Sequence, residues 1–325
     1  MKTFFKILSA LVMVLVLSGV GGYFYMRQKF APPANQLVIS ALPATGTLRW
    51  QADTVAKIAV PHAELLVPVR LPNCPRTCYL QFDTGAPYTL LYARQLAALA
   101  ERYPHLAPAL AVQENVVPEF RFALGSSQVK VGQARVLLNG AGQLPADSLA
   151  PFIIGTLGTD VLEGRVLVLD YAAGRFTLGH EVPPALAART HFAPLTFPER
   201  RVLLEAGVDG ESRQLLFDSG SSAYTLITSQ QNWQRMALPG APARTDTTNS
   251  WGKKLLVHTV PTAARFRFGA TDLPLGTVTY MEGMNLMQQM LTRFSGLEGM
   301  LGNEPFVGGT LILDVKGGRY GVVGR

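Results

Sequence analysis

Two short segments of the chain combine an aspartate with a small hydroxyl residue and a glycine. Asp83-Thr84-Gly85 and Asp218-Ser219-Gly220 each follow an apolar run, and the two aspartates are 135 residues apart. Glycine permits a sharp backbone turn, so each carboxylate can lie at the end of a strand and approach the other. Two adjacent carboxylates cannot both ionise at low cost and therefore share one proton. Such a pair can perform general acid–base catalysis, because one group activates a water molecule while the other polarises a carbonyl.

The segments around these aspartates belong to an internal repeat. The repeated blocks, in order, are Leu80–Ala86 with Leu215–Ser221, Tyr88–Leu91 with Tyr224–Ile227, Phe120–Phe122 with Phe266–Phe268, and Gly155–Arg175 with Gly299–Arg319. Because the blocks keep their order and nearly their spacing, the chain is predicted to consist of two homologous lobes. The lobes are placed at residues 59–180 and 195–325, with a linker over 181–194 and, over 30–58, a tether that could include a first strand.

The rest of each lobe is predicted to be mainly β-structure with a few short helices. Runs rich in Val, Ile and Leu are bounded by Gly, Pro or Asp, which is typical of strands. They include Val67–Leu71, Val129–Leu138, Arg165–Leu169 and Thr310–Leu313. Helical spacing of apolar residues predicts helices over Ala93–Glu101 and Met284–Phe294. Asp170 and Asp314 precede turn residues and are interpreted as turn caps without a catalytic role.

These features resemble the aspartic proteases of the pepsin and retropepsin clan. Phe217–Ser222 looks pepsin-like, whereas Asp83–Ala86 and Leu157–Leu162 look more like the retropepsins. The resemblance covers residues 59–325. It is specific because the Asp-(Thr/Ser)-Gly motif and a downstream brace segment, Thr156–Gly158 or Met300–Gly302, both recur in register. It implies an all-β, bilobal pepsin-like acid protease fold made of two duplicated retropepsin-like lobes, with an extended peptide bound between them.

The resemblance also implies a role for each residue of the two loops. Asp83 and Asp218 are the catalytic dyad, and Thr84 and Ser219 are hydroxyl residues that bond across the lobes. The supporting loop residues are Gly85, Gly220 and Ser221, and the structural braces end at Gly158 and Gly302.

The chain departs from that family in two respects. Pepsin-like members carry a Tyr on a flap of the first lobe, but residues 104–170 contain neither Tyr nor Trp, and Phe120 and Phe122 are the main aromatic residues there. Trp251 either covers the cleft from the second lobe or is a loop residue without such a role. In addition, Ala86 stands where the second lobe has Ser221. A missing hydroxyl donor is expected to raise the upper working pH, because hydrogen bonds to an ionised carboxylate favour its ionisation.

The prediction that follows is an aspartic endopeptidase. It hydrolyses a bond of a peptide or protein substrate with water activated between Asp83 and Asp218, and it needs no cofactor. One alternative is a non-catalytic peptide-binding or envelope-scaffolding protein on the same fold, and another is an enzyme that processes its own chain within residues 30–58. Both loops lie in one chain, so dimerisation is not required to complete the site.

Other functional classes lack their signatures. The formal net charge is +7, but the 29 Lys and Arg are scattered with no run of three, so no nucleic-acid partner is predicted. The five histidines are isolated and show no ligand spacing, so no metal is predicted. There is no G-x-S-x-G motif and no phosphate-binding glycine loop, which argues against a serine hydrolase and a nucleotide enzyme.

The amino terminus contains an apolar run of twenty residues, Ile7–Met26, preceded by Lys2 and Lys6. Twenty helical residues at about 1.5 Å each span a hydrocarbon core of about 30 Å. Residues 1–29 are therefore predicted to form a signal anchor, a single transmembrane helix, with a cleaved signal peptide as the alternative. The short amino tail favours an inside amino end, which places residues 30–325 on the periplasmic or extracellular side of the membrane.

The two cysteines, Cys74 and Cys78, flank the tip of a predicted hairpin whose strands are Val67–Pro72 and Cys78–Phe82. They are close enough in sequence to form a disulfide that stabilises the turn modestly. Two free thiols remain the alternative, because the spacing alone does not decide between them.

Overall fold

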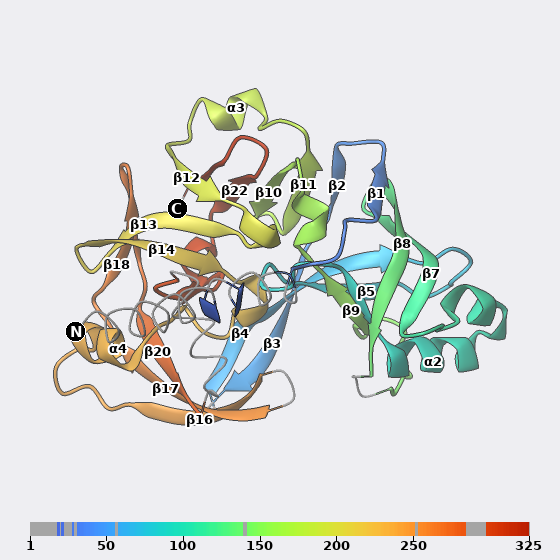
Figure 1. The fold of residues 1–325 in the computed structure, drawn as a ribbon, viewed down its shortest axis with the longest axis horizontal. Coiled ribbons are helices and arrows are strands. Elements are labelled where there is room, and N and C mark those ends of the chain that lie inside the picture. The colour runs from blue at the N-terminus through green and yellow to red at the C-terminus, as the bar shows by residue number, and fades with distance from the viewer. Residues whose placement is uncertain are drawn as a thin grey trace, which may run out of the picture. The chain divides into compact units, whose positions relative to one another are not determined.

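The computed structural model describes residues 18, 19, 21, 22, 28, 31–55, 58–138, 142–250, 253–283 and 297–324 (Figure 1). The chain divides into two compact units, Met1–Ala34 and Asn35–Arg325. Within the described part of the chain, no helix is both long and apolar enough to cross a membrane. Most of the predicted anchor Ile7–Met26, the whole of the predicted helix Met284–Phe294, and Trp251 lie outside the described residues.

The unit Asn35–Arg325 is mostly β-structure, as the sequence predicts. Its strands are β1 (Leu37–Ser40), β2 (Ala44–Thr47), β3 (Arg49–Val55), β4 (Ile58–Arg70), β5 (Cys78–Phe82), β6 (Leu90–Tyr92), β7 (Val116–Leu124), β8 (Ser127–Leu137), β9 (Ile153–Leu157), β10 (Val166–Asp170), β11 (Arg175–Gly179), β12 (Phe192–Thr196), β13 (Leu203–Val208), β14 (Glu211–Phe217), β15 (Leu226–Ile227), β16 (Arg244–Ser250), β17 (Lys253–Pro261), β18 (Arg265–Phe268), β19 (Thr271–Pro274), β20 (Thr277–Glu282), β21 (Met300–Leu301), β22 (Thr310–Asp314) and β23 (Arg319–Val323). Its helices are α2 (Ala93–Arg102), α3 (Pro184–Ala187), α4 (Gln230–Met236) and the 3₁₀ helices η1 (Pro104–Leu110), η2 (Thr159–Leu162), η3 (Pro198–Arg200), η4 (Ser219–Ser221) and η5 (Glu304–Phe306).

The strands form two sheets. The first sheet has the order β1-β8-β6-β9-β5-β4-β3, with β7 paired to β4 and β8. The second sheet runs from β16 through β14 and β13 to β12, and continues through β23, β22, β10 and β11 to β2. We call residues 35–180 the first half and residues 192–324 the second half. The strands of the first half divide between the two sheets, whereas those of the second half all lie in the second sheet.

The two halves meet through their repeated strands. β10 and β22 are equivalent strands of the repeat, and they pair antiparallel with Val168 opposite Ile312. Figure 1 shows β12, β22, β10, β11 and β2 side by side in this part of the second sheet. Asp170 and Asp314 end these two strands, and their carboxylates accept the backbone N–H of Ala173 (2.9 Å) and Gly317 (2.7 Å). Their prediction as turn caps is therefore confirmed.

Most of residues 37–55 form the strands β1, β2 and β3, so the segment 30–58, predicted as a tether with a first strand, contains three strands. β1 pairs with β8 in the first sheet, and β2 pairs with β11 in the second sheet. Each of these pairings joins segments far apart in the sequence, for example Leu37 with Val131. The mixed polarity of this segment gives only a weak local strand signal, and pairing with distant strands stabilises its conformation.

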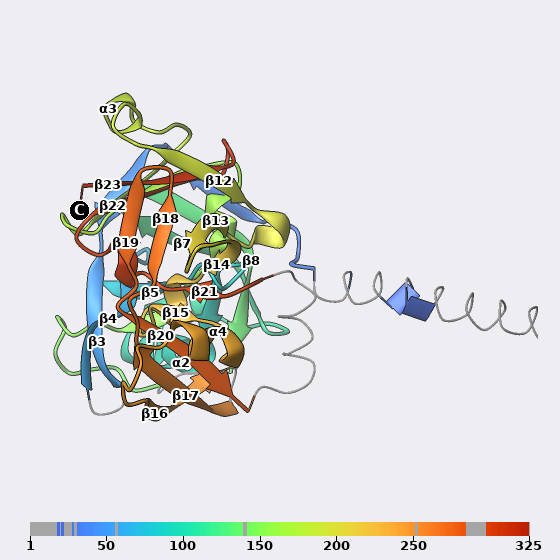
Figure 2. The same cartoon turned by 90° about the vertical axis from the view of Figure 1, so that its left-hand side faces the viewer.

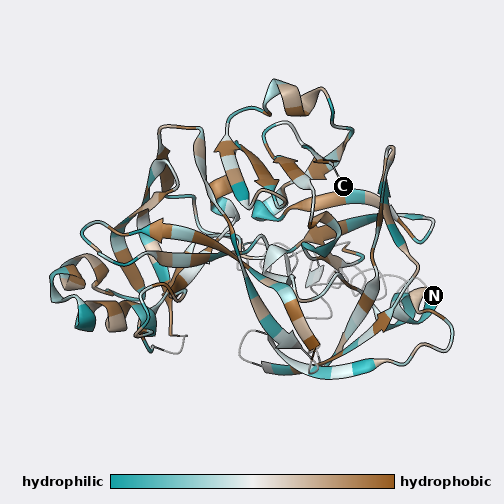
Figure 3. Cartoon of the chain, turned by 180° about the vertical axis from the view of Figure 1, so that it is seen from behind, coloured by the Kyte–Doolittle hydropathy of each residue, from teal (hydrophilic) through white to brown (hydrophobic). Residues whose placement is uncertain are grey.

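The other predicted elements are found where the composition places them. Helix α2 matches the predicted Ala93–Glu101, and its buried face includes Leu96 and Leu99. Phe120 and Phe122 of β7 are 2% and 0% exposed, so both belong to the core and neither can cover a cleft. Hydrophobic and hydrophilic stretches alternate along many strands (Figure 3), as expected for sheets with one buried face.

Two long hairpins stand beside the loops that carry the aspartates. In the first hairpin, the carboxyl half of β4 pairs with β5, while its amino half, from Ile58 to Leu66, pairs with β3. In the second hairpin, β16 pairs with β17, and β17 continues the second sheet through β20. Figure 2 shows the ends of both hairpins at the same end of the unit.

Candidate active site

The two aspartates lie at equivalent strand ends. Asp83 follows β5 and Asp218 follows β14, and each strand runs parallel to a short brace strand, β9 or β21. The backbone N–H of Asp83 donates to the carbonyl of Leu157 (3.1 Å), and that of Asp218 donates to the carbonyl of Leu301 (2.8 Å). The braces therefore hold both aspartates by the same backbone contact, as the repeat predicts.

The hydroxyl residues of the two loops bond across to the opposite half. The Thr84 hydroxyl donates to the carbonyl of Phe217 (2.6 Å) and accepts the N–H of Ser219 (2.9 Å). The Ser219 hydroxyl donates to the carbonyl of Phe82 (2.8 Å) and accepts the N–H of Thr84 (3.0 Å). Both side chains are almost fully buried. This reciprocal set of four bonds fixes the distance between the two loops.

The glycines of the loops bring the two carboxyl groups together. A Cβ on Gly85 would lie 2.7 Å from Oδ1 of Asp218, and a Cβ on Gly220 would lie 2.5 Å from Cγ of Asp83. Each glycine therefore packs against the carboxylate of the opposite half, and no larger residue fits at either position. The two carboxyl groups are close enough to share a hydrogen bond.

The surroundings of the two carboxyl groups differ. Burial and the charge of Asp218 raise the pKa of Asp83 to about 8, against the lowering effect of the N–H groups of Gly85 and Ala86. Asp218 accepts the N–H of Gly220 (3.0 Å) and the hydroxyl of Ser221 (2.7 Å). Hydrogen bonds to a carboxylate favour its charged form. Burial and the neighbouring carboxylate therefore favour the protonated form of Asp83, and the pair shares one proton near neutral pH.

The polar residue after each brace also bonds to an aspartate loop, which the sequence analysis missed. After Gly302, the Asn303 amide donates to the carbonyl of Ser219 (3.3 Å) and to the hydroxyl of Ser222. After Gly158, the Thr159 hydroxyl lies 3.1 Å from the carbonyl of Ala86. A signal was present in the sequence, because both positions are polar within apolar surroundings and occupy the same place in the repeat.

Gly158 and Gly302 themselves lie directly under the loops. A Cβ on Gly158 would lie 2.8 Å from the carbonyl oxygen of Ala86, and one on Gly302 would lie 3.1 Å from that of Ser221. Asp160, the next polar residue of the first brace, is buried and accepts both the N–H and the hydroxyl of Thr89 at 2.8 Å. Asp160 is thus a structural residue, separate from the aspartate pair.

Removal of the Thr84 hydroxyl is expected to destabilise the fold. In Thr84→Val, the N–H of Ser219 and the carbonyl of Phe217 both lose a buried partner, so the free energy of unfolding should fall by about 2–4 kcal/mol. Denaturant unfolding measures this effect. The control is Thr228→Val, which removes a more exposed hydroxyl that donates to Glu298 and should cost below about 1 kcal/mol. Equal losses in the two variants would contradict the structural role of the Thr84 bonds.

Cys74 and Cys78 flank the turn between β4 and β5, as predicted, and the structure has both as free thiols. A hydrogen bond from Cys78, with smaller contributions from Arg76 and His105, lowers the pKa of Cys74 to about 6. The same bond and burial raise the pKa of Cys78. The predicted disulfide joins two thiols that are already in contact, and it stays a prediction.

Iodoacetamide at pH 7 is expected to alkylate Cys74 and to spare Cys78. The reason is that the thiolate is the reactive form, and only Cys74 is both partly exposed and ionised at that pH. Peptide mass mapping after a short exposure measures the ratio. Protein prepared under oxidising conditions should react at neither position until it is reduced. Equal labelling of both thiols in the reduced protein would contradict the arrangement.

The site contains no obvious place for a metal. Across the ranges that the structure describes, no three His, Cys, Asp or Glu side chains gather in a way that could hold an ion.

No protein-family model matches the chain, and no curated protein has a significantly similar sequence.

Proposed function

We propose that the protein is an aspartic endopeptidase of the pepsin and retropepsin type, with its two halves as the two lobes. The observation that carries the proposal is the pair of carboxyl groups, each packed against the glycine of the opposite loop. A buried carboxylate pair is costly to maintain, and groups with strongly shifted pKa values cluster at functional sites. The four reciprocal bonds of Thr84 and Ser219 support the proposal, because they serve to hold this pair in place.

The proposed mechanism gives each carboxyl group one role. The Asp218 carboxylate takes a proton from a water molecule, and the water oxygen forms a bond to the carbonyl carbon of the peptide. At the same time Asp83 gives its proton to the carbonyl oxygen, which yields a tetrahedral diol. Asp218 then gives its proton to the leaving nitrogen, and Asp83 takes one from a diol hydroxyl as the C–N bond breaks. The pair ends the cycle with one proton, as it began.

A peptide library tests this proposal. The purified full-length protein is expected to cleave a subset of library peptides in mildly acidic to neutral buffer, and a statine-type mimic of the diol should block cleavage, because such mimics bind more tightly than substrates. Mass spectrometry of the products identifies the bonds cut. Absence of cleavage across the library, with peptide binding retained, would instead favour a peptide-binding scaffold on this fold.

Ala86→Ser is expected to move the basic limb of the pH–rate profile to lower pH by about half a unit or more, because a new hydroxyl donor favours the ionised form of Asp83. Ser221→Ala, which removes the bond to Asp218 Oδ2, is the matched control and should move the profile to higher pH. The measurement is kcat/KM against pH for the three proteins. If the pH–rate profile of Ala86→Ser did not move, the missing hydroxyl at position 86 would not explain the working pH.

We also propose that residues 1–29 anchor the protein in a membrane with the remaining chain on the extracytoplasmic side. The apolar run Ile7–Met26 supports the anchor. Fusion of a reporter that is active only outside the cytoplasm to the carboxyl end tests the orientation. Activity of the reporter is expected, and an inactive but stable fusion would reverse the orientation.

A further inference from the structure

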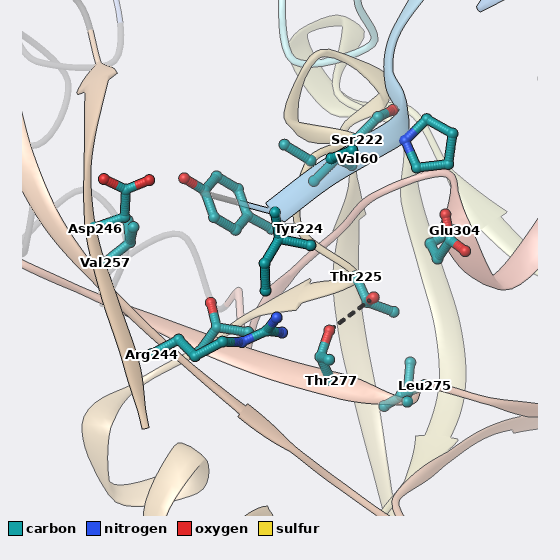
Figure 4. A pocket seen from close by; sticks show the side chains of 16 residues that line it. Val60, Ser222, Tyr224, Thr225, Arg244, Asp246, Val257, Leu275, Thr277 and Glu304 are labelled. Carbon is teal, nitrogen blue, oxygen red and sulfur yellow. Dashed lines mark hydrogen bonds between the residues drawn. The ribbon is translucent and has the colours of Figure 1, made fainter. Parts of the chain in front are cut away.

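A cavity of about 310 Å³ lies beside the Asp218 loop (Figure 4). Its floor consists of Ser222–Thr225 and Leu275–Thr277, and the Thr225 and Thr277 hydroxyls bond to each other across it (3.1 Å). Ser221, which donates to the Asp218 carboxylate, directly precedes the floor. The cavity therefore begins one residue beyond the serine that bonds the Asp218 carboxylate.

The two long hairpins form the walls of the cavity. Ile58–Pro61 of β4 form one wall, and the β16–β17 hairpin forms the other with Arg244, Asp246, Val257 and Thr259. The β3–β4 hairpin is fixed to the floor side, because β4 lies against η4 and His62 Nδ1 lies 3.4 Å from Glu304 Oε2. Its β4 strand therefore lies on the floor side, opposite the β16–β17 hairpin across the cavity.

The base of the β3–β4 hairpin is held by aromatic contacts. The Trp50 ring stacks on the ring of Tyr171 (5.7 Å between centroids) and contacts the ring of His62 (5.0 Å). The Tyr171 hydroxyl donates in turn to Asn303 (2.5 Å), the residue that bonds the Ser219 loop. These contacts make the hairpin a fixed part of the site.

The first half offers no such enclosure among its described residues. In the second half, the β16–β17 hairpin follows helix α4, whereas in the first half helices α2 and η1 lead directly into β7. Among the described residues, the cavity therefore lies between two hairpins on the Asp218 side of the pair.

The charged groups around the cavity are mainly acidic. Asp246 and Glu304 line it at opposite sides and Arg244 lies below Tyr224 (Figure 4). Burial, with smaller contributions from the carboxylates of Asp246 and Asp53, raises the pKa of the Tyr224 hydroxyl. The two lining carboxylates, Asp246 and Glu304, against the one lining guanidinium, Arg244, favour a cationic ligand group over an anionic one.

We propose that this cavity binds the free amino end of a peptide, so that the protein cuts a bond a short distance from that end. The inference rests on the proposed function, because it takes the aspartate pair as the place of cleavage. At about 3.3 Å per extended residue, about two to four residues between the amino end and the cut would span about 7–13 Å.

A set of matched peptides tests the inference. One cleavable peptide is prepared with a free amino end, with an acetylated end, with six residues added before it, and with six residues added after it. For the full-length protein, acetylation and amino-end extension are expected to lower kcat/KM at least about tenfold, because a buried cation contact is lost. Extension at the carboxyl end should leave kcat/KM nearly unchanged. Equal rates for all four peptides, or a loss on carboxyl-end extension alone, would overturn the inference.

Charge variants add a second readout. Asp246→Asn and Glu304→Gln are expected to reduce the preference for the free amino end, while Glu101→Gln, an exposed helix residue, should keep it. Binding of the free and acetylated peptides to the Asp218→Asn protein by calorimetry separates the two proposals. Preferential binding of the free peptide without any cleavage by wild type would retain the amino-end site and refute the peptidase. Equal binding, or none, would overturn the amino-end site itself.

Discussion

Asp83→Asn is expected to lower kcat/KM by about 10³- to 10⁴-fold, the range that a positioned general acid or base contributes. Asparagine keeps the shape of the side chain but cannot carry the proton that the pair shares. Asp218→Asn should show a loss of similar size, because neither group works without the other. Residual activity within about tenfold of wild type in either variant would show that the carboxyl pair does not catalyse the reaction.

The same Asp83→Asn change is expected to stabilise the protein at neutral and higher pH. The pKa of Asp83 in the folded chain, about 8, lies above the ordinary value of 3.8, so the folded chain holds this proton more tightly than the unfolded chain does. The free energy of unfolding of wild type therefore falls as the pH rises from about 4 to about 8. Asparagine does not titrate, so the variant should gain about 1–3 kcal/mol at pH 8, and the gain should vanish towards pH 4.

Denaturant unfolding at several pH values, together with peptide cleavage, measures both effects on one protein. Asp170→Asn is the matched control, because it makes the same chemical change in an exposed turn. It should leave activity unchanged and show no pH-dependent gain in stability. A uniform loss of stability in Asp83→Asn at all pH values would indicate that the carboxyl group is held for structure alone.

Gly220→Ala is expected to lower kcat/KM by at least about a hundredfold, because a small displacement of a reacting group has effects of that size. The new Cβ would meet the Asp83 carboxyl group, with 2.5 Å to its Cγ, so the pair has to separate. Overpacking of this kind should also cost about 1–3 kcal/mol of stability. Gly85→Ala, which meets Asp218 at 2.7 Å, should behave in the same way.

The control for this change is Gly207→Ala. The nearest atoms to a Cβ there, those of Arg267, are 3.6 Å away, which is an ordinary contact, so activity and stability should stay close to wild type. Denaturant unfolding and peptide cleavage are measured separately on the Gly220→Ala protein. Retained cleavage in a stable Gly220→Ala protein would show that the carboxyl pair tolerates separation and would contradict the shared proton.

The sequence predicts the aspartate pair and its braces well for a physical reason. The Asp-(Thr/Ser)-Gly turns, the brace glycines and the strands before them depend on local residue types, and the repeat supplies each one twice. Thr84 and Ser219 could be expected to bond across the halves because they are buried hydroxyls next to the turn. In the structure each of these hydroxyls donates to a backbone carbonyl and accepts a backbone N–H of the opposite half, which gives four hydrogen bonds.

The features that the sequence does not predict depend on distant partners. β1 and β2 are stabilised as strands by pairing with β8 and β11. The β3–β4 hairpin extends beyond the rest of the first sheet, because the amino half of β4 pairs only with β3 in that sheet. The cavity beside Asp218 arises where that hairpin meets residues almost two hundred positions later, such as Asp246. Phe120 and Phe122 stand in a strand of the core, although their place in the chain suggested a flap.

The pairing of β10 with β22 bears on the difference between the two sides of the site. Val168 and Ile312 are equivalent residues of the repeat and pair with each other, so an approximate two-fold axis passes between them. Two identical copies of one half could make the same self-complementary pairing, as subunits of a symmetric dimer do. Such a dimer would have two identical carboxyl environments and two identical groove ends. Because both halves lie in one chain, each half can change alone. One aspartate has a serine donor and the other an alanine neighbour, and among the described residues the cavity between two hairpins lies on the Asp218 side.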